Sequence, residues 1–155
     1  MKRYIWAIVL LFFLGCSGEE IYKTPEKTLE RYVQNRRQGT ALAMESALNC
    51  FPREDKKWWD AKYLRICELQ YGKFNAMCGE GLANRSAIWN DLVEPLGPKS
   101  TNVTSSDVDD KEGVATLVVD GQEVYFIKEH NNWKLDGLFG IREELTEKWP
   151  ELAEM

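Results

Sequence analysis

The chain has 155 residues, a net charge of −5 and a pI of about 5.1, and 44% of its residues are hydrophobic. This length and composition fit one globular domain with one core. An acidic chain repels phosphate groups, which argues against a nucleic-acid partner and against electrostatic attraction to anionic lipids.

The amino terminus has the order of features found in a bacterial export signal. Lys2 and Arg3 precede an apolar run over residues 4–14, which is too short to span a bilayer. The run closes with Phe13-Leu14-Gly15-Cys16, and polar residues follow. This segment resembles the lipobox of bacterial lipoproteins, in which a small residue comes directly before the cysteine that receives the lipid.

The lipobox resemblance implies a cleaved signal peptide over 1–15 and a lipidated tether over 16–23. Cys16 would carry a diacylglyceryl thioether and an acylated amine (palmitate or a similar chain), and two or more acyl chains anchor a protein stably. The expected location is the bacterial cell envelope, with membrane contact through the lipid on Cys16. Ser17 favours the outer over the inner membrane if the organism is Gram-negative.

Helix signals dominate the first half of the mature chain. Thr24 can cap a helix that Pro25 and Glu26 begin, and Gly39 ends it. Apolar residues at helical spacing and the breaks between them predict three further helices, over 41–50, 57–71 and 82–96.

The second half changes to strand signals. The β-branched segment 101–108 predicts an edge strand, and stronger strands are expected over 114–119, 122–129 and 133–138. An amphipathic helix is predicted from Ile141 to the end, interrupted at Pro150. The expected fold class is therefore α+β. In it, N-terminal helices pack on a curved antiparallel sheet of three or more strands, and a C-terminal helix follows, all within one domain over 24–155.

The central hairpin allows a register to be predicted. Asp120-Gly121 suits a two-residue turn, so Leu117 should lie opposite Val124. Because side chains alternate between faces, Leu117, Val119, Val124 and Phe126 should share the face that packs on the helices.

Both ends of the mature chain resemble small lipoproteins with a nuclear-transport-factor-2-like, or cystatin-like, domain. The matching segments are 24–33 with Gly39, and then 115–121, 124–128 and 133–136. The resemblance implies a sheet that wraps a helical layer and leaves a cone-shaped pocket. The aromatic-rich segment 58–96 and the C-terminal helix depart from the family and would fill or cover that pocket.

Three cysteines remain beside Cys16. An oxidising compartment favours a disulfide among Cys50, Cys67 and Cys78, and the sequence leaves its pairing open. Their spacing matches no zinc motif and His130 is the only histidine, so we expect no metal site and no cofactor.

Few side chains suggest a site. Trp58, Trp59 and Tyr63 form either a ligand or partner surface or a stripe of the core. His130 is expected in a solvated turn, and Asp136 on the surface rather than in a pocket. Residues 54–57 are expected as a solvated helix start.

The sequence therefore favours a non-enzymatic envelope lipoprotein that binds a protein partner, such as a toxic protein that it neutralises, or a small apolar ligand. The alternative is a pocket enzyme of the isomerase or cyclase type on a cystatin-like cone. No catalytic motif of those enzymes can be placed on this sequence, so no catalytic residue is assigned. A filled concave face of the sheet would argue against the enzyme.

Overall fold

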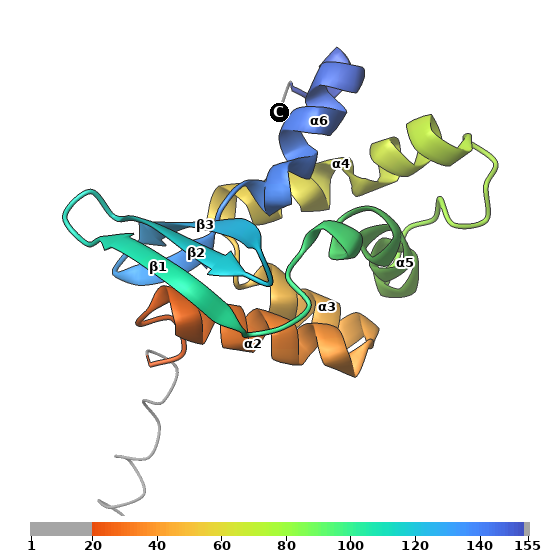
Figure 1. The fold of residues 1–155 in the computed structure, drawn as a ribbon. Coiled ribbons are helices and arrows are strands. Elements are labelled where there is room, and N and C mark those ends of the chain that lie inside the picture. The colour runs from red at the N-terminus through yellow and green to blue at the C-terminus, as the bar shows by residue number, and fades with distance from the viewer. Residues whose placement is uncertain (1–19, 154–155) are drawn as a thin grey trace, which may run out of the picture.

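The computed structural model describes residues 20–153, and it has the α+β class that the sequence predicts (Figure 1). Cys16, Ser17 and the expected signal peptide lie outside the described residues. The helices are α2 (Pro25–Gln38), α3 (Ala41–Leu48), α4 (Arg53–Tyr71), α5 (Leu82–Leu92) and α6 (Ile141–Lys148), and the strands are β1 (Val103–Asp109), β2 (Val114–Val119), β3 (Gln122–Glu129) and β4 (Asn132–Leu135).

The four strands form an antiparallel meander in the order β1-β2-β3-β4. Leu117 pairs with Val124, as the turn chemistry predicts, and Asp120 and Gly121 both have positive φ. β1 is an edge strand, also as predicted, and its pairing with β2 shifts register between Val103 and Ser105.

One face of the sheet is buried against the N-terminal helices, and Figure 1 shows α2 running along it. Side chains that alternate along β2 and β3 fill this inner face, and each is at most 2% exposed: Leu117, Val119, Val124 and Phe126. The predicted face assignment is therefore confirmed. The apolar side chains of α2, including Leu29 and Val33, complete the core between the two layers.

Helix α2 begins and ends at the residues that the sequence indicates. The Thr24 hydroxyl accepts a hydrogen bond from the Lys27 amide at 3.3 Å, and Gly39 adopts the left-handed conformation with φ of 63°. Thr28 is completely buried, and its hydroxyl donates a hydrogen bond to the Trp133 carbonyl at 2.8 Å. This bond links α2 to β4.

Several boundaries differ from the prediction. Helix α4 begins at Arg53, four residues earlier than expected, because Pro52 in extended backbone can precede the first helical turn. Strand β4 ends at Leu135, three residues early, because the chain turns away from the sheet at Asp136. Helix α6 ends at Lys148, just before Pro150.

No helix within residues 20–153 is both long and apolar enough to cross a membrane.

Candidate functional site

A groove lies where the chain leaves the sheet after β4, along the first half of β3. Its volume is about 270 Å³, and its walls come from β3, from the turn at Gly137–Gly140 and from the start of α6. The apolar and aromatic side chains in its lining are Val124, Tyr125 and Phe139. The acidic side chains are Glu123, Asp136 and Glu143.

The charged side chains of the groove are all acidic, because none of the described residues that line it is basic. Partial burial raises the pKa of the Asp136 carboxyl above its ordinary value, and the nearby negative charge of Glu143 raises it further. Glu123 is engaged with the hydroxyl of Tyr125. A positively charged group that entered the groove would relieve the repulsion between Asp136 and Glu143.

The turn at Gly137–Gly140 is the most unusual piece of backbone in the described chain. All four residues have positive φ: 63° at Gly137, 50° at Leu138, 59° at Phe139 and 83° at Gly140. Left-handed backbone costs roughly 1–2 kcal/mol for each residue that carries a Cβ. Leu138 and Phe139 must therefore be held by their surroundings.

Side-chain packing supplies part of that support. Leu138 is completely buried. Phe139 packs edge to face against Tyr32 and Phe51, with ring centroids 5.2 Å apart in each pair. The left-handed turn therefore directs one apolar side chain into the core and a second against it, while its backbone shapes the groove.

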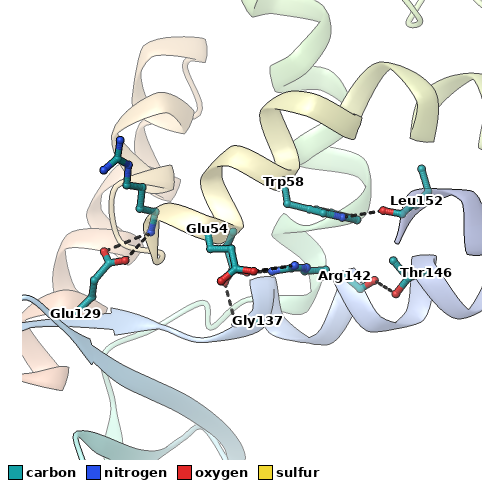
Figure 2. Close-up of polar contacts among 9 residues, drawn as sticks. Glu54, Trp58, Glu129, Gly137, Arg142, Thr146 and Leu152 are labelled. Carbon is teal, nitrogen blue, oxygen red and sulfur yellow. Dashed lines mark hydrogen bonds and ion pairs between the residues drawn. The ribbon is translucent and has the colours of Figure 1, made fainter. Parts of the chain in front are cut away.

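A buried carboxylate supplies the rest. Asp55 on α4 accepts a hydrogen bond from the Gly137 amide at 3.1 Å and one from the Arg142 guanidinium at 3.0 Å. Glu54 also contacts Arg142, at 3.3 Å, and Figure 2 shows this group bridging α4 to the start of α6. Burial raises the pKa of Asp55, and the contacts with Arg142 and Gly137 oppose that shift.

A second hydrogen bond links the far end of the C-terminal segment to α4. The indole N–H of Trp58 donates to the Leu152 carbonyl at 3.2 Å (Figure 2). We call Asp55, Trp58 and Arg142 the C-terminal clasp, since they join α4 to the segment that follows β4.

The aromatic residues singled out from the sequence are placed inside the protein. Trp58 is 1% exposed and Trp59 is not exposed, which corrects their interpretation as a ligand or partner surface. Trp59 packs edge to face on Trp89, with centroids 5.3 Å apart. Tyr63 is half-buried against the core. The two indoles therefore serve packing and the C-terminal clasp.

The charged start of α4 also differs from expectation. The sequence predicts residues 54–57 as solvated, but the Asp55 side chain is only 7% exposed, whereas that of Glu54 is 69% exposed. Nothing in the sequence places the partner of Asp55, because Arg142 lies 87 positions away.

The cysteines resolve into one disulfide and one thiol. Cys67, four residues before the end of α4, is bonded to Cys78. Cys50 is free and completely buried, and burial raises the pKa of its thiol to about 12. A thiol that stays protonated at neutral pH is a poor nucleophile.

The remaining candidates lie on the surface. His130 is exposed at positive φ in the turn between β3 and β4, as expected. Asp136 also reaches solvent, but its carboxyl is partly buried where it lines the groove. Among residues 20–153, no three side chains of metal-ligating type gather closely enough to hold an ion.

No family model, no curated protein and no solved structure matches this chain. The resemblance to nuclear-transport-factor-2-like domains therefore stays a prediction.

Proposed function

We propose that this chain is a membrane-anchored envelope lipoprotein of non-enzymatic type whose domain binds a protein partner. The groove beside β3 receives a positively charged side chain of that partner. The observation that carries this proposal is the lining of the groove, where three carboxylates lie beside Tyr125 and Phe139 without a basic residue among them.

The anchor part of the proposal is supported by the lipobox-like segment that ends in Gly15-Cys16. The disulfide between Cys67 and Cys78 adds independent support, because disulfides persist in exported proteins and are rare in the cytosol. Both features favour placement outside the cytoplasm.

The filled inner face of the sheet favours a binding role over an isomerase or cyclase. Such an enzyme needs an acid or base at the bottom of a pocket, where burial tunes it. Here Leu117, Val124 and Phe126 occupy that side of the sheet. The buried carboxylate of Asp55 lies outside this region, on α4, and is engaged with Gly137 and Arg142.

A protein partner suits the groove better than a wholly apolar small molecule. A purely apolar ligand would cover Asp136 and Glu143 without pairing them, and desolvating unpaired charge is costly. A lysine or arginine side chain offers both a charge for the carboxylates and an aliphatic stem for the rings of Tyr125 and Phe139.

The anchor is tested by labelling cells with a fatty-acid analogue. The wild-type chain should incorporate the label, and the Cys16→Ala variant should not. Label retained by Cys16→Ala would contradict lipidation at this residue, and an unlabelled wild type would contradict the lipoprotein proposal as a whole.

The groove is tested by affinity capture from native membranes with mass spectrometry, followed by titration of the captured protein. The Asp136→Asn/Glu143→Gln double variant should bind about 10-fold or more weakly, because it removes two charges from the groove. Glu144→Gln/Glu147→Gln is the matched control, with the same change in charge at exposed positions of α6. Equal binding by both double variants would contradict the groove as the binding place.

A further inference from the structure

The loop between α4 and α5 presents an aromatic side chain to water. We call residues 72–81 the Phe74 loop. Phe74 is 98% exposed, more than any other large hydrophobic residue within the described part of the chain. A phenyl ring in water forgoes the free energy that its burial would release.

The Phe74 loop is closed covalently and is not a free tip. The disulfide from Cys78 to Cys67 ties the loop back to the buried side of α4. The Asn75 amide donates to the Gly72 carbonyl at 3.0 Å, and the Cys78 amide donates to the Asn75 carbonyl at 2.9 Å. Consecutive turns therefore fix the backbone on both sides of Phe74.

Two asparagine side chains add further restraint. Asn75 accepts a hydrogen bond from the Met77 amide at 2.9 Å. Asn84, on α5, donates to the carbonyls of Ala76 and Met77 at 3.1 Å each. The backbone around Phe74 is thus ordered before any partner arrives, which lowers the entropic cost of binding through this ring.

The position of the loop separates it from the expected anchor. The groove-like hollow that contains Arg53 at the start of α4 also contains Tyr22, close to the first described residue. Helix α4 has 19 residues and extends about 28 Å from there to the Phe74 loop. In Figure 1 the loop projects from the end of the molecule opposite the start of α2.

The short tether makes this separation meaningful. Three residues lie between Cys16 and Glu20, so four extended residue steps separate the two and reach about 14 Å at most. A lipid on Cys16 therefore holds the Tyr22 end near the bilayer and leaves the Phe74 loop at the far end. Because the Phe74 loop then lies away from the bilayer, this geometry favours a protein over a lipid as its partner.

The charge beside Phe74 says more about the partner. Lys73 is exposed and has no ion pair within the described part of the chain. A complementary surface would place a carboxylate near Lys73 at the rim of an apolar pocket that admits the phenyl ring.

We propose that the Phe74 loop is a preorganised docking point, in which Phe74 enters an apolar pocket of a protein partner and Lys73 pairs with an acidic residue at its rim. This inference rests on the proposed partner-binding function and gives that function a second contact surface, distinct from the groove beside β3.

The first test is photo-cross-linking in native membranes with the full-length protein. Benzoylphenylalanine in place of Phe74 should form an adduct with one protein. The same probe in place of Leu42, which is 72% exposed on α3, is the matched control and should not form that adduct. An adduct with lipid from position 74, or the same protein adduct from both positions, would overturn the proposal.

The second test measures affinity for the cross-linked protein after its purification. Phe74→Ala should weaken binding by about 10-fold to 100-fold, as the loss of an anchoring aromatic residue does, and Leu42→Ala should leave it unchanged. Lys73→Glu should also weaken binding, and Cys67→Ser/Cys78→Ser should weaken it while retaining the ring. Unchanged affinity in Phe74→Ala would overturn the inference.

The outcomes separate this inference from the proposed function. If Cys16 takes up label and Asp136→Asn/Glu143→Gln loses the partner while Phe74→Ala keeps it, the Phe74 inference alone fails. If Cys16 takes up no label, the lipoprotein proposal fails, and the orientation argument for Phe74 fails with it.

Discussion

Asp55 and Arg142 form an ion pair at 3.0 Å although 87 positions separate them in the chain. The carboxylate is buried and also accepts a hydrogen bond from the Gly137 amide. One side chain therefore stabilises both the left-handed turn and the first turn of α6. The stability of the C-terminal segment should therefore depend strongly on this residue.

Replacing Asp55 by alanine should lower the free energy of unfolding by about 1.5–3 kcal/mol, the range for hydrogen bonds that involve a charged group. Asp55→Asn should lower it less, because the amide oxygen can still accept the bond from Gly137. Urea unfolding followed by tryptophan fluorescence measures both values. Glu54→Ala is the control, since Glu54 is exposed and its contact with Arg142 should contribute no more than about 0.5 kcal/mol. An equal loss in Glu54→Ala would mean that Asp55 has no special role.

Asp136 gives a prediction about pH. Its pKa is raised in the folded protein by burial and by Glu143, so the folded state binds this proton more tightly than the unfolded state does. The contribution of Asp136 to stability is therefore present below its unfolded pKa of about 3.9 and declines as pH rises through the folded value. Asp136→Asn should unfold at a higher temperature than wild type at pH 7, with the difference vanishing near pH 3. Thermal melts across this range would contradict the assignment if the difference grew toward low pH.

The sheet gives a prediction about its two faces. Leu117→Ala should cost about 2–5 kcal/mol of unfolding free energy, because it removes buried methyl groups and leaves a cavity. Thr116 points to the other face and is only partly buried, so Thr116→Ala should cost much less. Denaturant melts of the two single variants decide the matter, and a larger loss for Thr116→Ala would be incompatible with the packing described above.

The disulfide should contribute to stability as well as to the Phe74 loop. Cys67 and Cys78 are 11 positions apart. A disulfide that closes a loop of this length lowers the entropy of the unfolded chain and should raise the free energy of unfolding by about 2–4 kcal/mol. Cys67→Ser/Cys78→Ser should lose this amount in urea unfolding. Adding a reductant should destabilise the wild-type chain and have no effect on the double variant. A reductant effect that persisted in the double variant would have to come from another residue.

The sequence allowed local features to be predicted because their causes lie within a few residues. Thr24 caps α2 through the Lys27 amide, three positions away, and Asp120-Gly121 sets the register of Leu117 on Val124 through one tight turn. Alternation along β2 and β3 then gave the buried face. The choice of Cys67 and Cys78 over Cys50 stayed open because it depends on where α4 ends in space.

The groove could not be predicted for the same reason. Its shape depends on positive φ at Leu138 and Phe139, two residue types that rarely adopt this conformation. The hydrogen bond to Asp55 and the ring contact with Tyr32 stabilise this turn, and both residues are distant in the chain. The sequence signal that existed was the pair of glycines at 137 and 140, which bracket the turn.

The edge strand β1 has a consequence for crowding. Copies held by the lipid anchor proposed above would meet repeatedly in the plane of a membrane, where an unpaired edge strand can pair with the edge of a neighbouring molecule. β1 carries exposed Asp107 and Asp109, and its register shift lies between Val103 and Ser105. Carboxylates brought together edge to edge repel one another, and an irregular strand offers a poor template. The outer edge of the sheet is thereby protected against self-association at the concentrations that confinement to a surface would produce.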